Sequence, residues 1–176
     1  MDLERTFGSL RAGVLYMLCG IGGNLLSACF LFNQIQAGAS GAIFGQVGLM
    51  LIDVFVNWKT IRRPVCNLVV VLVVIVISVI SGMMPGVDNF AHVGGLVVGI
   101  VGGLAFLPHL LKGQGATARK IVVAITFPLL IAMFGGLFYL FYGYVAKGNN
   151  IDCEWCEQIN CAEALLGEKW CSGNAL

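Results

Sequence analysis

Residues 66–84 read CNLVVVLVVIVISVISGMM, an apolar run that is interrupted only by Asn67, two serines and one glycine. The run is rich in β-branched residues, which in a water-soluble protein would favour a buried strand. Its length, however, matches the roughly 20 apolar residues that a helix needs to cross a bilayer. In a chain that is apolar elsewhere too, this length predicts a transmembrane helix.

The composition of the whole chain agrees with a lipid environment. Of the 176 residues, 59% are hydrophobic and only 11% are charged. Ordinary soluble domains are roughly 45–50% apolar and about 25% charged. A soluble core of this size would not bury so much apolar surface, so a water-soluble globular domain is excluded.

Five stretches are long and apolar enough to span a bilayer. They are Ala12–Phe32, Gly38–Trp58, Val65–Met84, Phe90–Leu110 and Ile121–Val145. We therefore predict an all-α fold, a polytopic transmembrane helical bundle with five spans. Residues 1–146 form the membrane domain, and residues 147–176 form a polar tail.

The positively charged residues predict the orientation of the spans. Eight of the ten Lys and Arg residues fall on one side of the five spans: Arg5, Arg11, Lys59, Arg62, Arg63, Lys112, Arg119 and Lys120. Such an excess marks the cytoplasmic side of a membrane. We therefore expect a cytoplasmic N-terminus and a C-terminal tail in the lumen or outside the cell.

The tail carries four of the seven cysteines, Cys153, Cys156, Cys161 and Cys171. On the oxidising side of a membrane, an even set of cysteines in a short segment predicts two disulfides, with three possible pairings. Zinc binding by four thiolates is the competing interpretation. The remaining three, Cys19, Cys29 and Cys66, are interpreted as small apolar packing residues.

A serine and a histidine occupy matched positions in two of the predicted spans. The second span begins Gly38-Ala39-Ser40-Gly41, and the fourth begins Asn89-Phe90-Ala91-His92. Both spans run from the outer side inwards, so Ser40 and His92, two or three residues into their helices, should lie at similar depth. A serine hydroxyl becomes a nucleophile when a base takes its proton, and histidine suits that role near neutral pH.

The residues around Ser40 fit the same chemistry. Gly38 and Gly41 leave room for a substrate backbone, and the Ser40 amide is an unpaired donor in a first helical turn, suited to an oxyanion. Phe44 lies one turn after Ser40, where it could stack on the His92 ring and orient it. No carboxylate is well placed for that task, since Asp53 is near the other end of its helix and Asp88 lies in the loop four residues before His92. The alternative is packing alone, because serine and glycine often serve helix contacts in membranes.

The chain resembles the rhomboid intramembrane proteases over nearly its whole length. The resemblance is carried by GGNLLSACF, GASGAIFG, VDNFAHVGGLVVGIVGG and the cysteine-rich ending CEWCEQINC through KWC. It implies Ser40 as nucleophile, His92 as general base and Phe44 as the ring-stacking partner. It further implies that Gly95, Gly99 and Gly103 permit the close helix crossing that brings the base to the serine.

Rhomboid proteases have two further helices before the segments matched here, and the second supplies a histidine and an asparagine to the oxyanion hole. By this resemblance the chain is expected to lack both helices and to be a fragment, a truncated gene product or a degenerate relative. Loss of one oxyanion donor typically costs about 10²–10³ in rate.

The expected function is hydrolysis of peptide bonds in or near the transmembrane segments of membrane-protein substrates. No metal, organic cofactor or nucleic acid is expected to take part, and the lipid bilayer is the one other partner. A membrane of the secretory pathway, Golgi or plasma membrane, is the expected location. Two rival functions stay open. One is a non-catalytic rhomboid-like protein that binds membrane clients. The other is a transporter or channel fragment, which the small number of intramembrane carboxylates disfavours.

Overall fold

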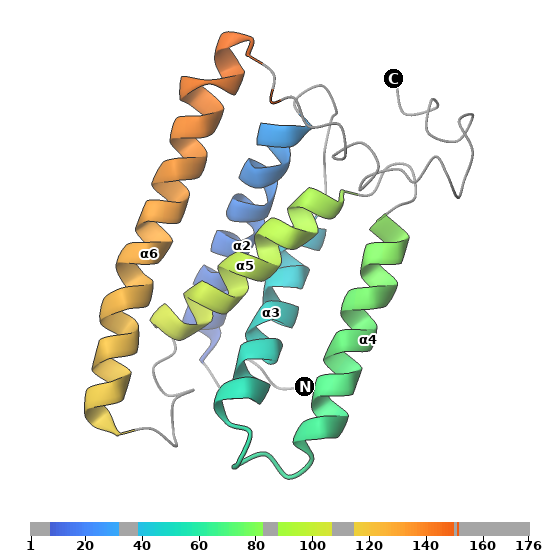
Figure 1. Cartoon of the computed structure of the whole chain (residues 1–176), viewed down its shortest axis with the longest axis vertical. Coiled ribbons are helices and arrows are strands. Elements are labelled where there is room, and N and C mark those ends of the chain that lie inside the picture. The colour runs from blue at the N-terminus through green and yellow to red at the C-terminus, as the bar shows by residue number, and fades with distance from the viewer. Residues whose placement is uncertain (1–7, 32–38, 83–87, 107–114, 150, 152–176) are drawn as a thin grey trace.

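The computed structural model describes residues 8–31, 39–82, 88–106, 115–149 and 151, and within them the secondary structure is entirely helical (Figure 1). The helices are α2 (Ser9–Phe30), α3 (Ser40–Val56), α4 (Pro64–Gly82), α5 (Asn89–Phe106) and α6 (Ala116–Gly143), followed by the 3-10 turn η2 (Val145–Lys147). The prediction of an all-α bundle with five apolar helices is confirmed. The cysteines proposed for disulfides, Cys153, Cys156, Cys161 and Cys171, lie outside the described residues.

Four of the five helices are long and apolar enough to cross a membrane, and α3 is shorter at 17 residues. At 1.5 Å per residue, α3 is about 26 Å long, slightly less than the roughly 30 Å of a bilayer's hydrocarbon core. The helix ends at Val56, two residues before Trp58, and Asn57 is its C-cap. The Asn57 side-chain amide donates to the Asp53 carboxylate at 2.8 Å, and its backbone N–H donates to the Asp53 carbonyl at 3.0 Å.

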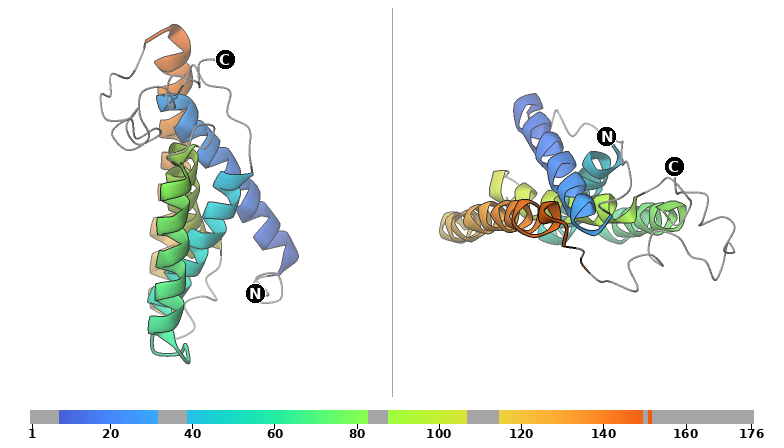
Figure 2. Two further views of the ribbon diagram at one scale, coloured as in Figure 1. Left: turned by 90° about the vertical axis from the view of Figure 1, so that its right-hand side faces the viewer. Right: turned by 90° about the horizontal axis from the view of Figure 1, so that it is seen from above.

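Helix α5 lies at the centre of the bundle, where it crosses α2 and α3 (Figure 1). Helix α6 packs against α5 and α2, and α4 lies at the opposite edge against α3. Figure 2 shows that α2 leans away from the row formed by α6, α5 and α4. The buried hydrophobic core sits between these helices and consists of Leu15, Cys19, Leu49, Val98 and Leu130.

One glycine face of α5 is pressed against α3. A Cβ atom on Gly95 would overlap the backbone of Gly41, and a Cβ on Gly99 would overlap the backbone of Gly45. Gly95 and Gly99 are four residues apart on α5, and Gly41 and Gly45 are four residues apart on α3, so the contact repeats once per helical turn. The two backbones can approach this closely because neither helix carries a side chain at the crossing.

A second glycine face of α5 is pressed against α2. A Cβ on Gly94 would lie 2.9 Å from the Gly23 Cα, and a Cβ on Gly102 would lie 2.6 Å from a methyl group of Leu15. The sequence had indicated Gly95, Gly99 and Gly103 as the crossing residues, and all three are buried. The structure adds Gly94 and Gly102, which allow α5 to pack closely against α2 as well as α3.

The two outer helices expose most of their apolar surface. In α4 only Val71 and Gly82 are buried, and in α6 only Thr126 and Leu130. Side chains that are this apolar and this exposed fit a surface that contacts lipid rather than water. Of the cysteines expected to pack within the bundle, Cys19 and Cys29 are buried as predicted. Cys66 lies on the uncovered surface of α4 and is exposed, so that prediction was wrong.

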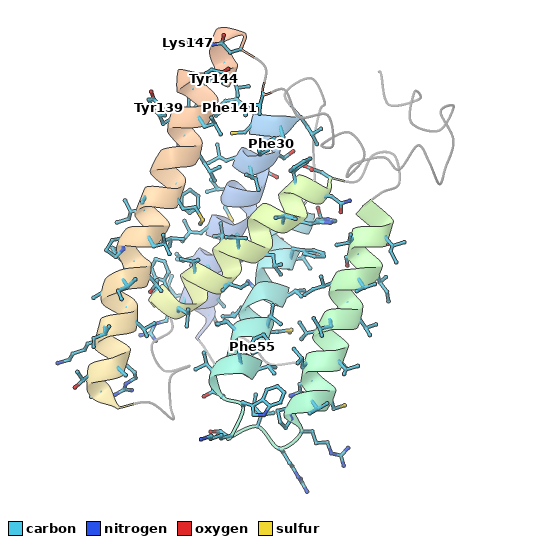
Figure 3. All side chains as sticks on the ribbon, in the orientation of Figure 1. Phe30, Phe55, Tyr139, Phe141, Tyr144 and Lys147 are labelled. Carbon is cyan, nitrogen blue, oxygen red and sulfur yellow. The ribbon has the colours of Figure 1, made fainter. Side chains whose placement is uncertain are left out.

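The two ends of the bundle differ in charge. Because the chain crosses the bundle five times, α2, α4 and α6 end where α3 and α5 begin, and we call this end the site end. The opposite end, the basic end, carries Arg11, Lys59, Arg62, Arg63, Arg119 and Lys120. Aromatic residues mark both levels, with Tyr139, Phe141 and Tyr144 toward the site end of α6 and Phe55 at the basic end (Figure 3). Tyrosines near the end of a span are typical of a membrane interface.

Candidate active site

Ser40 is the first residue of α3 and is half-buried at the site end of the bundle. This is one or two residues nearer the helix start than the sequence had suggested. Ala39, which precedes it, makes no side-chain cap hydrogen bond to the first turn. Amide donors at such a helix start lack intrahelical acceptors, and the helix dipole is positive there. An anionic oxygen near the Ser40 amide would therefore be stabilised.

Helix α5 begins with a well-formed cap that fixes the turn bearing His92. The Asp88 carboxylate accepts hydrogen bonds from the backbone N–H groups of Phe90 at 2.9 Å and Ala91 at 3.1 Å. The His92 N–H donates to the Asp88 carbonyl at 3.3 Å, and only 5% of Asp88 is exposed. An aspartate that bonds to the second and third amides after it is an N-cap, and it satisfies donors that would otherwise be unpaired.

His92 is the fourth residue of α5, and its ring lies flat against the ring of Phe44 from α3. The ring centroids are 4.3 Å apart and the ring planes differ by 9°. Both side chains are buried, with 5% of His92 and 7% of Phe44 exposed. Among the described residues, the His92 Nδ1 atom has no hydrogen-bond partner. Among the described contacts of this imidazole, the stack on Phe44 is therefore the one that restrains the plane of the ring.

The first turns of α3 and α5 meet at Gly41 and Ala91. A Cβ on Gly41 would lie 3.0 Å from the Ala91 carbonyl oxygen and 3.7 Å from its Cβ. Ser40 comes one residue before this contact on α3, and His92 comes one residue after it on α5. The close approach of the two helix starts thus places the hydroxyl-bearing and imidazole-bearing residues at the same level of the bundle.

Two further contacts hold the start of α5 to its neighbours. The Phe90 ring stacks on Phe30 at the end of α2, with centroids 4.9 Å apart and planes 15° apart. The Asn89 side chain fills the space beside Gly82 and donates to the Val79 carbonyl of α4 at 3.4 Å. Sequence reasoning missed both contacts. The Asp88 cap had a usable signal, since an aspartate directly before an apolar helix is a typical N-cap.

Three other residues considered in the sequence analysis, Gly38, Gly103 and Asp53, do not form part of the Ser40–His92 region as described. Gly38 lies outside the described residues, and Gly103 is buried within α5. Asp53 lies toward the basic end, where it bonds to Asn57 and is separated from His92 by most of the length of α3. Within the described ranges, no group of three His, Cys, Asp or Glu side chains could hold a metal ion.

Comparison with known proteins bears on this constellation. The family model described as Rhomboid domain matches residues 1–109. The chain is 38% identical to RHOMBOID-like protein 4 of Arabidopsis thaliana over 96% of its own length and 45% of that protein. It is 36% identical to RHOMBOID-like protein 6, mitochondrial, of the same plant, over 90% of its length and 56% of that protein.

The chain is also similar to a relative whose name describes it as inactive. The chain is 34% identical to Inactive rhomboid protein 1 of Homo sapiens over 91% of its own length, which is 18% of that protein. The chain spans about half the length of the two plant relatives, and less than a fifth of this one. Sequence similarity alone therefore leaves two kinds of function open, and the residues at the site have to distinguish them.

Proposed function

Because the chain belongs to the rhomboid family, we propose that it is an intramembrane serine endopeptidase that cleaves membrane-protein substrates in or near their transmembrane segments. The observation that carries this proposal is the stack of His92 on Phe44, which lies one helical turn after Ser40 on α3. A buried imidazole held by a ring stack, at the same level of the bundle as a hydroxyl at a helix start, provides the groups that acyl transfer requires.

In the proposed reaction His92 takes the proton of the Ser40 hydroxyl as the oxygen attacks a substrate carbonyl. The Ser40 amide, in the first turn of α3, donates to the oxyanion that develops on the carbonyl oxygen. His92 then returns the proton to the leaving amine, and an acyl-enzyme remains on Ser40. Water activated by the same imidazole releases the acid product and restores the serine.

Phe44 takes over a task that soluble serine proteases give to a carboxylate. An aspartate in a triad holds its histidine in one orientation and stabilises the charged ring. A phenyl ring 4.3 Å away and nearly parallel restricts rotation of the imidazole. A parallel aromatic face also attracts a cation, so the stack favours the protonated ring that forms during the reaction. Asp88 caps α5 through its Oδ1 atom and makes no described hydrogen bond to the His92 ring.

A non-catalytic, client-binding function is the second candidate, and the similarity to Inactive rhomboid protein 1 favours it. In that case the apolar surfaces of the bundle would hold single-span proteins without cutting them. The chain retains both Ser40 and His92, and the ring stack that a binding protein has no need to keep. For this reason we favour the protease.

A fluorophosphonate probe, which reacts covalently only with activated serines, tests the proposal. The 176-residue chain, purified in detergent and returned to liposomes, is expected to be labelled, and Ser40→Ala is expected to abolish labelling. Ser81→Ala is the matched control, because Ser81 is an exposed serine near the site end of α4 whose hydroxyl donates to Ile77 at 2.8 Å. That variant should label like the parent chain.

Labelling that persists in Ser40→Ala, or a folded parent chain that never labels, would reject the protease. The client-binding function then makes its own prediction: single-span membrane proteins co-purify intact with the parent chain and equally with Ser40→Ala. Cleaved substrate fragments that depend on Ser40 would reject that second function in turn.

We further propose that the basic end faces the cytoplasm and that residues 147–176 lie in the lumen of the secretory pathway, where the four tail cysteines form disulfides. An Asn-x-Thr acceptor appended after Leu176 is expected to be glycosylated, and the same acceptor placed before Met1 is not. Endoglycosidase sensitivity on gels measures both. The reverse pattern would invert the orientation, and import into isolated mitochondria would instead match the relative named as mitochondrial.

A further inference from the structure

The turn that joins α3 to α4 is a preorganised platform of positive charge. The Thr60 and Ile61 N–H groups both donate to the Asn57 carbonyl, at 2.8 Å and 3.0 Å. The Asn57 side chain is itself buried, with 9% exposed, and is bonded to Asp53. The turn is therefore anchored from within, and its conformation does not depend on the charged side chains that follow.

Three cations extend from this anchored turn, and each is exposed: Lys59, Arg62 and Arg63. The acidic residue closest to them in the described sequence is Asp53, which is half-buried and already accepts the Asn57 amide. Residues 53–63 thus carry +3 from the three cations and −1 from Asp53, a net formal charge of +2. Helix α4 begins at Pro64, directly after Arg63, and the positive end of its dipole adds to the same potential.

Exposed apolar side chains lie next to these charged residues in the sequence, at the end of α3 and the start of α4. Phe55 is 56% exposed, Trp58 is 39% exposed and Val65 is 61% exposed. Figure 3 shows Phe55 beside the α3–α4 turn. Val69 and Val73 follow Val65 at four-residue spacing along α4 and are also exposed, at 51% and 48%. A ligand for this region must have an anionic end and long apolar chains.

We propose that the α3–α4 turn binds the headgroup of an anionic phospholipid, with its acyl chains against Phe55 and the valine face of α4. The headgroup phosphate is held by Lys59, Arg62 and Arg63. Trp58 lies at the boundary between the polar and apolar parts, as aromatic side chains do at membrane interfaces. An anionic lipid fits better than a soluble phosphate ester, because only the lipid covers the exposed apolar surface as well.

Basic residues at this end have a simpler role, which is to fix the orientation of the spans during insertion. That role needs only charge on the correct side, whereas lipid binding needs charge at one place beside an apolar face. Arg119 and Lys120 at the start of α6 supply the comparison. They lie at the same end of the bundle, but across it from the α3–α4 turn (Figure 1).

Fluorescence quenching of Trp58 tests the proposal in the full chain. The chain has three tryptophans, so a W155F/W170F background leaves Trp58 as the only one. The protein is reconstituted in phosphatidylcholine vesicles that contain a fixed minor fraction of brominated lipid. Brominated phosphatidylserine is expected to quench Trp58 about threefold more strongly than brominated phosphatidylcholine, since each Lys or Arg near the surface attracts anionic lipid.

The preference should fall to nearly none in the triple variant K59Q/R62Q/R63Q, and it should persist in R119Q/K120Q. R62K/R63K should retain most of it, because lysine still binds phosphate as a point charge. Added glycerophosphoserine, the soluble headgroup, should not compete, and high salt should weaken the preference.

Equal quenching by the two brominated lipids in the parent chain would by itself overturn the proposal, before any variant is measured. So would a preference that survives in K59Q/R62Q/R63Q, or one that R119Q/K120Q removes to the same extent, since either result would assign it to the general charge of this end. Competition by glycerophosphoserine would transfer the site to a soluble phosphate ester. None of these outcomes depends on protease activity, so the proposal stands or falls separately from the proposed function.

Discussion

Replacing Gly99 by leucine is expected to prevent stable assembly of the bundle. The Cβ of any residue at position 99 overlaps the carbonyl of Gly45, which belongs to the backbone of α3 and cannot move aside as a flexible side chain does. Overpacking a well-packed interior typically costs 1–3 kcal/mol, and here helix α3 itself must shift, so we expect at least about 3 kcal/mol. The better helix propensity of leucine returns only about 1 kcal/mol.

The matched control is Gly136→Leu in α6. Gly136 is exposed in the same kind of apolar helix, and a Cβ there would meet nothing within 4 Å. That substitution should be neutral or slightly stabilising. The folded fraction, measured by circular dichroism and size-exclusion chromatography during titration with sodium dodecyl sulfate, compares the two. Gly99→Ala should fall between them, and equal resistance of Gly99→Leu and Gly136→Leu would contradict the close crossing.

The sequence predicted the helices well because apolar length alone identifies them. Each of the five expected spans contains or overlaps one helix, and residues 66–84 specify α4 almost completely. Helix ends were less well predicted. α3 stops at Val56 with Asn57 at its C-cap, and the predicted span that continues to Trp58 did not anticipate this end.

Helix packing was only partly predictable. Spacing by four residues placed Gly95, Gly99 and Gly103 on one face, and the resemblance to rhomboid proteases implied a crossing with the Ser40-bearing helix, which Gly95 and Gly99 make. The use of Gly94 and Gly102 against α2 depends on the angle at which α2 crosses α5, a property of the assembled bundle. The exposure of Cys66 has the same origin, since it depends on α4 having few neighbours.

The stack of Phe44 on His92 was easier to predict than the contacts that hold the start of α5. Phe44 lies one turn after Ser40, so the two share a helix face, and the stack on His92 follows once α3 and α5 cross near Gly41. The Phe30–Phe90 stack and the Asn89 contact with α4 join segments that are distant in sequence. Neither has a local pattern, so only the structure reveals them.

Removing the imidazole with His92→Ala is expected to slow fluorophosphonate labelling of Ser40 by about 10²–10⁴-fold, the usual contribution of a general base. Phe44→Leu keeps an apolar side chain but removes the ring that lies 4.3 Å from His92. An imidazole that can turn away is a weaker base on average, and misplacement of this kind can cost up to about 10²-fold. Labelling rates of the purified variants, at matched folded fractions, measure both effects.

The double variant Phe44→Leu/His92→Ala separates positioning from direct action. If Phe44 acts only through the histidine, removing its ring has no further effect once the imidazole is gone, so the two losses do not add. Phe90→Leu is the control, because it breaks a comparable ring stack on the same turn of α5 but leaves the His92 ring on Phe44. It should label at nearly the parent rate, and Phe44→Tyr, which keeps the ring, should recover most of the rate.

Additive losses in the double variant would mean that Phe44 stabilises the fold or contacts the probe independently of His92. A Phe90→Leu rate as low as that of Phe44→Leu would mean that any loosening at the start of α5 is enough. Either result would remove the special role given to the stack. A non-additive cycle with an unaffected Phe90 variant requires an orienting contact on the imidazole itself, since general loosening of the helix would act on both rings alike.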